Sequence, residues 1–168
     1  QNRKQQFMVY RKSESKPKEV YGIMGNKGHG KDTFANILVS SNKGASFTII
    51  HFADALKDLV VNVFGITRYD VETQEGKEAK FAVPINIDLF LPAIKAKTGL
   101  SIKPQGLIAA SPRELLQFVG SNYIRTVDQS YWVGKIKSIL NTKKRIVIPD
   151  TRFTNEAAVI TASGGKII

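Results

Sequence analysis

Short apolar runs alternate with predicted helices along most of this chain. Four of these runs have the length and composition of buried strands, at 20–24, 48–52, 145–149 and 166–168. Predicted helices follow the first three runs, at 33–39, 53–64 and 155–162. Strands that alternate with helices usually form a parallel sheet through right-handed crossovers, so we predict an α/β fold with a three-layer parallel sheet.

The stretch 66–110 interrupts this alternation. It is first rich in charged residues and then apolar, and it contains Pro84, Pro92 and Pro104. Prolines break regular elements, so we interpret this stretch as an insertion on the substrate side of the domain.

A helix start follows the insertion. Ser111 has the residue type of an N-cap, Pro112 suits the first helical position, and Glu114 stands where a capping box has its acidic partner. The predicted helix runs to about Tyr123 or Val127.

The second half of the chain also predicts a ligand-binding edge. Asp128 is expected to cap a helix over 131–140, which leads into the strand run at 145–149. Asp150 then falls at the carboxyl end of that strand, where open α/β sheets bind their ligands. Asp150 is therefore a candidate site residue.

The two ends of the chain differ in character. Residues 1–19 are polar and basic, and we expect a disordered arm or an expression remnant ahead of one domain over 20–168. The run at 166–168 resembles the beginning of a strand, so we expect the C-terminal part of the domain to be missing.

Composition narrows the classes of function. The 168 residues include no cysteine, which excludes disulfides and thiolate metal sites and fits a reducing cytoplasm. No apolar run is long enough for a membrane span, so no membrane partner is expected. The net charge of +11 favours anionic partners, among which we expect a small nucleotide rather than nucleic acid.

The most specific motif is the glycine-rich stretch GNKGHGKDT at 25–33, between the first predicted strand and helix. Its glycines let backbone N–H groups face a polyphosphate, and Lys31 can reach the β- and γ-phosphates. Ser or Thr usually follows this lysine, but Asp32 stands here, and its carboxylate is a candidate Mg²⁺ ligand. The alternatives are a flexible glycine turn and, with poorer spacing, a dinucleotide-binding fingerprint.

Four blocks of the sequence together resemble one family. They are GNKGHGKDT at 25–33, FADALKDLV at 52–60, RELLQFVGSNYIR with the following YWV at 113–133, and IPDTRFTNE at 148–156. In this order they are similar to the bacteriophage deoxynucleoside monophosphate kinases, a branch of the P-loop kinases. The resemblance implies transfer of the γ-phosphoryl group of ATP, with Mg²⁺, to a deoxynucleoside monophosphate, in the host cytoplasm if the protein is phage-encoded. It also implies a P-loop kinase fold and makes a homodimer an expectation.

The resemblance further implies which residues bind each substrate. ATP would be held by Lys27, Gly28, Gly30, Lys31, Asp32 and Thr33. The acceptor would be held by Leu56, Lys57, Arg113, Gln117, Trp132, Asp150, Arg152 and Glu156. Catalysis would depend on Lys31, Asp150 and Arg152, because two phosphates must be aligned while cations neutralise the charge of the moving group.

Five members of the acceptor set would contact the phosphate or the nucleoside. Lys57 and Arg113 would receive the phosphate, Leu56 would pack beside the deoxynucleoside, Gln117 would offer its amide to a base edge, and Trp132 would stack on the base. Structural alternatives stay open: a solvated lysine, a surface arginine near a helix cap, and a core tryptophan.

The remaining three members follow the strand at 145–149. Asp150 would orient Mg²⁺ or the acceptor, and Arg152 would clamp a phosphate with two N–H groups. Glu156 would contact the deoxyribose or position Arg152. The structural alternatives are an ion pair between Asp150 and Arg152, and an acidic first-turn residue that stabilises its own helix.

Two points concern the function as a whole. His29 stands where the family often has Ser, and neither His29 nor His51 is expected to be catalytic. Another small-molecule P-loop kinase and a non-catalytic module that binds nucleotide or nucleic acid remain as alternative functions.

Overall fold

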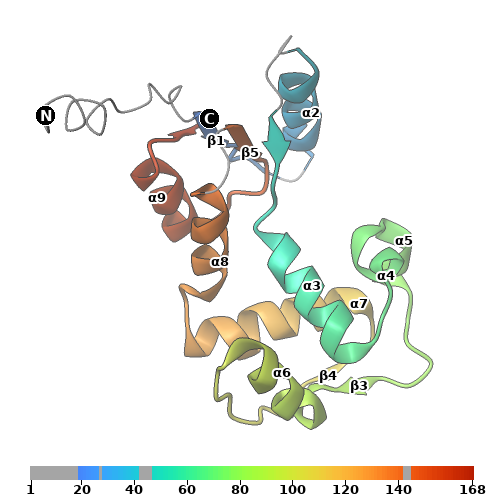
Figure 1. Cartoon of the computed structure of the whole chain (residues 1–168). Coiled ribbons are helices and arrows are strands. Elements are labelled where there is room, and N and C mark those ends of the chain that lie inside the picture. Colours follow the sequence, from blue (N-terminus) through green and yellow to red (C-terminus); the bar gives the residue numbers. More distant parts are fainter. Residues whose placement is uncertain (1–18, 27, 42–46, 142–144) are drawn as a thin grey trace, which may run out of the picture.

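The computed structural model describes residues 19–26, 28–41, 47–141 and 145–168. A parallel sheet lies at one end of the molecule, and a group of helices with a small hairpin lies at the other (Figure 1). The four strands of the sheet are arranged in the spatial order β2-β5-β1-β6, with bounds β1 (Glu19–Gly22), β2 (Thr48–Ile49), β5 (Arg145–Ile148) and β6 (Lys166–Ile167). Every pairing in this sheet is parallel.

The parallel sheet predicted from the sequence is confirmed, because each of its strands lies at one of the four apolar runs. Strand β1 begins at Glu19, one residue inside the stretch assigned to the basic arm, whose other residues lie outside the described part of the chain. The ladder continues past β1: the Ile23 N–H donates to the Ile148 carbonyl at 2.9 Å, and the Met24 N–H donates to the Ile168 carbonyl at 2.9 Å.

Helices cover both faces of the sheet. Helix α2 (Lys31–Ser41) packs on one face, and helices α8 (Tyr131–Leu140) and α9 (Thr154–Ala162) pack on the other. Strand β5 shows how the faces divide, since side chains alternate along a strand. Ile146 and Ile148 pack in a buried cluster with Ile136 of α8 and Ile160 of α9. Val147 packs on the opposite face. The alternation therefore gives the three predicted layers.

The helical end contains most of the remaining elements. Its helices are α3 (Ala53–Phe64), α4 (Arg68–Glu72), α5 (Gln74–Glu78), α6 (Leu91–Thr98) and α7 (Pro112–Gln117), with the 3₁₀ turn η1 (Ile87–Phe90), the π-helix η2 (Phe118–Arg125) and the hairpin strands β3 (Ile85–Asn86) and β4 (Ile108–Ala109). The predicted insertion at 66–110 supplies much of this part. Within the described residues, every helix is too short or too polar to cross a bilayer.

The helical end has a hydrophobic cluster of its own. Val71 of α4 and Leu115 of α7 are fully buried in it. Helix α8 joins this cluster to the sheet, because Trp132 belongs to the helical cluster whereas Ile136 and Leu140 belong to a sheet cluster. The molecule is therefore built on separate cores connected through shared elements.

Two predicted helix caps differ from the structure in detail. Ser111 accepts a hydrogen bond from the Glu114 N–H, as predicted for an N-cap. The Glu114 carboxylate, however, accepts from the Ala110 N–H at 2.8 Å, one residue before the cap, so the reciprocal bond is shifted. Asp128 does not cap α8 itself: it accepts from the N–H of Ser130, the residue at the N-cap, at 2.9 Å.

A polar contact closes the helical end around Tyr123, whose side chain is fully buried. The Tyr123 hydroxyl donates to the Asp88 carboxylate at 2.7 Å and accepts from the Leu107 N–H at 3.3 Å. Asp88 also accepts from the N–H groups of Gln105 at 3.0 Å and Gly106 at 2.8 Å. These bonds attach the chain before β4 to η1 and η2.

This contact predicts an alkaline loss of stability. Burial and the bond to Asp88 raise the pKa of Tyr123 from 10.0 to about 12. The neutral phenol therefore contributes stability that is complete below the unfolded pKa and is lost as the pH rises toward the folded pKa. We expect Tyr123→Phe to cost about 1–2 kcal/mol at neutral pH and to flatten the stability profile between pH 10 and 12. Urea unfolding across this range measures both effects, and an unchanged profile would contradict the assignment.

Candidate functional site

The glycine-rich loop connects β1 to α2 at the carboxyl edge of the sheet. Gly28 and Gly30 have φ values of 85° and 73°, a region that residues with a Cβ rarely adopt, so the path of the loop requires glycine there. The Phe34 N–H donates to the Gly30 carbonyl at 2.9 Å, and this is the first bond of the helix. The N–H groups before it have no acceptor within the helix; they belong to Lys31, Asp32 and Thr33.

The Lys31 side chain lies along this loop. Its ammonium donates to the Gly25 carbonyl at 2.6 Å and to the Asn26 carbonyl at 2.8 Å. The cation is thus held beside the N–H groups at the start of α2, where positive charge and backbone donors combine to favour an anion. Lys27, the other lysine predicted to hold ATP, lies outside the described residues.

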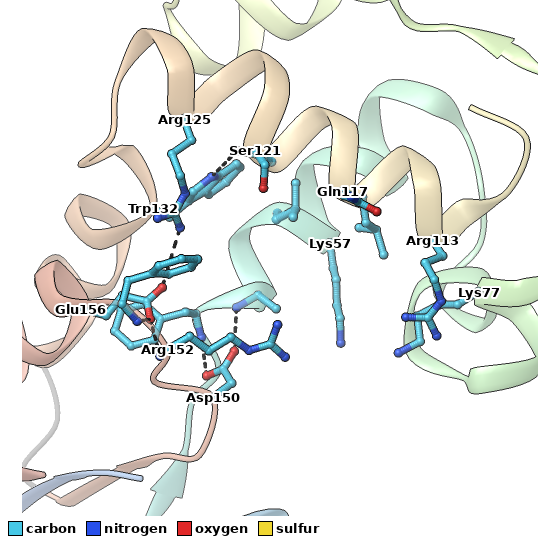
Figure 2. Close-up of a pocket in the computed structure, with 16 residues that line it drawn as sticks. Lys57, Lys77, Arg113, Gln117, Ser121, Arg125, Trp132, Asp150, Arg152 and Glu156 are labelled. Carbon is cyan, nitrogen blue, oxygen red and sulfur yellow. Dashed lines mark hydrogen bonds and ion pairs between the residues drawn. The ribbon is translucent and has the colours of Figure 1, made fainter. Parts of the chain in front are cut away.

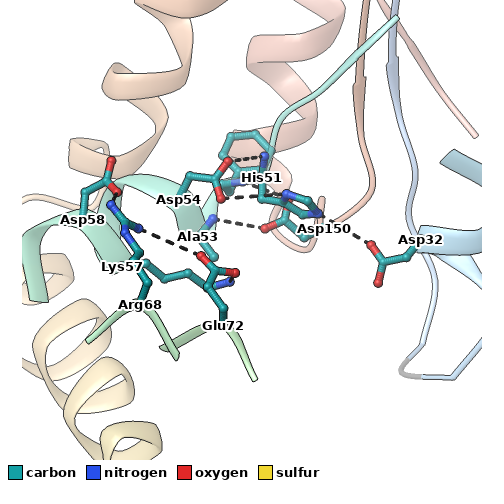
Figure 3. A network of polar contacts seen from close by, with 10 residues as sticks. Asp32, His51, Ala53, Asp54, Lys57, Asp58, Arg68, Glu72 and Asp150 are labelled. Carbon is teal, nitrogen blue, oxygen red and sulfur yellow. Dashed lines mark hydrogen bonds and ion pairs between the residues drawn. The ribbon is translucent and has the colours of Figure 1, made fainter. Parts of the chain in front are cut away.

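Asp32 connects the loop to the end of β2. Its side chain is 82% exposed, and its carboxylate faces His51 Nε2 at 3.6 Å (Figure 3). His51 Nδ1 lies 3.8 Å from the Asp54 carboxylate, and this carboxylate also accepts a hydrogen bond from the backbone N–H of His51 at 3.0 Å. The place of His51 between two carboxylates was not predicted, although a polar residue at the end of a strand run was a usable signal.

Asp32 could bind Mg²⁺ only if a nucleotide supplied further ligands. Among the described residues, no three His, Asp or Glu side chains gather into a group that could hold a metal ion. Mg²⁺ in nucleotide sites is commonly bound by one or two carboxylates, with water and phosphate oxygens completing its shell. A single exposed carboxylate at the start of α2 meets that requirement, so Mg²⁺ would be shared between Asp32 and the phosphates.

A pocket of about 440 Å³ lies between the carboxyl edge of the sheet and the helical end (Figure 2). Its walls come from α3, α5, α7, η2, α8 and α9 and from the segment that joins β5 to α9. All eight residues predicted to bind the acceptor are in its lining: Leu56, Lys57, Arg113, Gln117, Trp132, Asp150, Arg152 and Glu156. The structure thus brings together residues that are widely separated in the sequence.

Two cations of the lining are paired with carboxylates on α4 and α5. Lys57, whose side chain is 18% exposed, donates to Glu72 at 3.1 Å. Arg113 donates to Glu78 at 2.5 Å and to the side-chain carbonyl of Gln74 at 3.2 Å. Lys57 is therefore not the solvated lysine of its structural alternative. Arg113 is 39% exposed in the first turn of α7, so the alternative of a surface arginine near a helix cap stays open for it.

Asp150 and Arg152 do not form the ion pair considered as a structural alternative. The Asp150 carboxylate accepts from the N–H groups of Phe52 at 2.9 Å and Ala53 at 3.1 Å, which attaches the end of β5 to the start of α3. Within the described part of the chain, the Arg152 guanidinium has no carboxylate at ion-pair distance. Figure 2 shows it directed into the pocket, on the side of Lys57.

Glu156 is buried and holds the backbone that carries Arg152. Its carboxylate accepts from the N–H groups of Arg152 at 2.7 Å and Phe153 at 3.0 Å. The other carboxylate oxygen lies 3.8 Å from the Arg125 guanidinium, which stacks on the Phe153 ring at 4.0 Å from its centroid. These contacts fit the predicted role of positioning Arg152, and contact with a deoxyribose stays a prediction.

Trp132 is both a core residue and part of the pocket. It is 5% exposed within the helical cluster, and its indole N–H donates to the Gly120 carbonyl at 3.3 Å. A Cβ on Gly120 would lie 2.8 Å from a terminal methyl carbon of Leu56, so a larger residue there would displace the Leu56 side chain. The ring has little exposed surface, which agrees with the core alternative and leaves base stacking as a prediction.

Comparison with known proteins gives a broad class. No family model matches the chain. A protein of Acanthamoeba polyphaga mimivirus described as "Putative deoxynucleotide monophosphate kinase" is 28% identical over 164 residues, which cover 89% of this chain and 72% of that protein. This likeness supports a kinase. The bacteriophage origin suggested by the motifs stays a prediction.

For a kinase, three lining residues absent from the sequence prediction are notable: Lys77, Ser121 and Arg125. Two of them had a signal in the sequence. Ser121 and Arg125 continue, in steps of four, the series begun by Arg113 and Gln117, so all four residues share one face of α7 and η2. Lys77 had no such signal, because its place in the lining depends on how α5 packs beside α7.

Proposed function

We propose that this protein is an ATP-dependent, Mg²⁺-dependent P-loop kinase that phosphorylates deoxynucleoside 5′-monophosphates to diphosphates. The observation that carries the proposal is the pocket with cationic and aromatic walls at the carboxyl edge of the sheet, beside the glycine-rich loop. Its volume of about 440 Å³ is in the range of small-molecule sites. The distant similarity to the mimivirus protein agrees with this substrate class.

The donor triphosphate would lie on the glycine-rich loop. The N–H groups at the start of α2 would bind its oxygens, and Lys31 would exchange its bonds to Gly25 and Asn26 for the β- and γ-phosphates. Asp32 would hold Mg²⁺ together with these phosphates, and the bound ion would neutralise charge on the transferred group. In this scheme the loop aligns the γ-phosphorus toward the pocket.

The acceptor monophosphate would lie in the pocket. Arg152 points into it without a carboxylate partner among the described residues, so its two-pronged guanidinium is suited to a phosphate. Lys57 and Arg113 would supply further positive charge from the opposite wall. The base would extend toward Trp132 and Gln117, on which it would stack and to whose amide it would hydrogen-bond, respectively.

The alternatives differ from this proposal in what the pocket should accept. Another small-molecule P-loop kinase would use the same loop with a substrate that lacks a base. A non-catalytic nucleotide-binding or nucleic-acid-binding module would bind without turnover. The concave lining, which mixes aromatic and cationic side chains in a volume of about 440 Å³, favours a mononucleotide over a polymer.

A coupled assay of ADP release tests the proposal directly. With ATP, Mg²⁺ and dGMP, dTMP, dAMP or dCMP, we expect turnover of about 1–100 per second for at least one acceptor, with one diphosphate formed per ADP. The matching deoxynucleosides are the control, because they lack the acceptor phosphate. DNA binding without ADP release would favour the module, and ADP release that is independent of any acceptor would contradict the proposal.

A further inference from the structure

The pocket carries more positive charge than a monophosphate needs. In the described part of the chain, five cationic side chains line it, namely Lys57, Lys77, Arg113, Arg125 and Arg152. Two carboxylates, of Asp150 and Glu156, line it as well, and both already accept backbone N–H groups. Such an excess of cations would attract nucleoside diphosphates and triphosphates more strongly than monophosphates.

Two further carboxylates lie just behind this lining. Glu72 is at 3.1 Å from the Lys57 ammonium, and Glu78 is at 2.5 Å from the Arg113 guanidinium. Both are about half exposed, at 47% and 55% of their side-chain surface. They therefore place negative charge beside the two cations without being part of the pocket lining.

Each carboxylate has a second partner that keeps it in place. Glu72 is also 3.9 Å from the Arg68 guanidinium, which in turn pairs with Asp58. Glu78 also accepts a hydrogen bond from the Gln74 amide at 3.2 Å. If a phosphate attracts Lys57 or Arg113, Glu72 and Glu78 retain these partners and stay in place.

The helices that carry these carboxylates are closely packed. Val71 on α4 is fully buried in the helical cluster. A Cβ on Gly76 of α5 would lie 2.3 Å from the Tyr69 carbonyl oxygen, so α5 lies directly against α4. The position of the negative charge is therefore set by packing as well as by ion pairs.

We propose that Glu72 and Glu78 make the pocket selective for a monophosphate over nucleoside diphosphates and triphosphates. A phosphate monoester carries about two negative charges at neutral pH, and each further phosphate group adds more. Because repulsion from fixed carboxylates grows with the charge of the ligand, Glu72 and Glu78 weaken the binding of polyphosphates most. They thereby keep ATP out of the acceptor pocket and favour release of the diphosphate product. This inference rests on the proposed function.

Trp132 provides a direct measurement of binding. It is the single tryptophan of the sequence and lies in the pocket lining, so its fluorescence reports occupancy without any need for turnover. We expect the double variant Glu72→Gln/Glu78→Gln to bind dTMP about fivefold more tightly than wild type at low ionic strength. Binding of dTDP and dTTP to the same variant should tighten by at least about a further twofold per added phosphate.

Glu75→Gln is the matched control for Glu78→Gln. It removes the same charge from the same helix, but among the described residues Glu75 has no ion pair with a pocket cation. We expect Glu75→Gln to leave the ratio of dTDP to dTMP affinity at the wild-type value, and Glu78→Gln to raise it. Circular dichroism and thermal melting check that each variant is folded.

The outcomes separate this inference from the function on which it rests. A double variant that binds dTMP more weakly, or tightens all three nucleotides equally, would overturn the selectivity role while leaving the kinase proposal intact. A wild-type protein whose fluorescence responds to no nucleotide monophosphate, with dGMP, dAMP and dCMP tested beside dTMP, would overturn both.

Discussion

Replacement of Lys31 by alanine should lower the turnover number of the proposed kinase by about 10³-fold or more. Lys31 is the cation at the start of α2, and it lies beside the N–H groups that would bind the triphosphate. Its positive charge would stabilise the transition state more than the bound substrates, because negative charge shifts within the transferred group, so the loss should appear mainly in kcat. Coupled ADP-release kinetics with saturating acceptor measure it.

We expect Lys31→Ala to lose catalysis without losing its fold. The Lys31 ammonium makes bonds only to the Gly25 and Asn26 carbonyls among the described residues, both in an exposed loop. We therefore expect Lys31→Ala to change the unfolding free energy by no more than about 1 kcal/mol. Lys95→Ala on α6, outside the loop and the pocket lining, is the charge-matched control. A Lys31→Ala protein that is folded and fully active would exclude the loop as the donor site.

Arg152→Lys should lower kcat/KM for the monophosphate by about 10²-fold even though the positive charge is retained. The planar guanidinium can bind two phosphate oxygens at once, whereas an ammonium acts as a point charge. The backbone N–H of Arg152, not its side chain, is bonded to Glu156, so the substitution leaves that contact in place. Steady-state kinetics with varied acceptor at saturating ATP measure the loss, and KM for ATP should change little.

Arg145→Lys serves as the control for this substitution. Arg145 begins β5, at the opposite end of the strand from the pocket, and lies 3.6 Å from Glu19. The same chemical change there should leave both kinetic constants near the wild-type values. Equal losses in the two variants would indicate a general effect on folding and would remove Arg152 from the acceptor site.

Much of the sheet could be predicted because its signals are local. Runs such as Arg145-Ile146-Val147-Ile148 are apolar on both faces, as a strand covered by helices on both sides requires. The start of α7 was similarly evident from Ser111 and Pro112, whose capping chemistry depends on near neighbours. The acceptor set came from the family resemblance, and the observed sheet order, which brings the end of β5 beside the end of β2, helps to gather it in one pocket.

The contacts that could not be predicted are those made between distant segments. The bonds from the N–H groups at the start of α3 to the Asp150 carboxylate were not predicted, and its role toward a ligand stays a prediction. Nothing in the pattern of 66–110 indicated that Glu72 would pair with Lys57. Such pairs depend on the packing angle of short helices, which periodicity does not encode.

The separate hydrophobic cores on the two sides of the pocket have a consequence for how the protein could evolve. Lys31 begins α2, which packs against the sheet, whereas Lys57 and Arg113 lie on helices of the helical end, which has a cluster of its own. Substitutions that enlarge, shrink or reshape the helical cluster alter one wall and leave the glycine-rich loop undisturbed. In the proposed kinase, evolution could therefore change the acceptor through the helical cluster while the loop proposed to bind the triphosphate stayed the same.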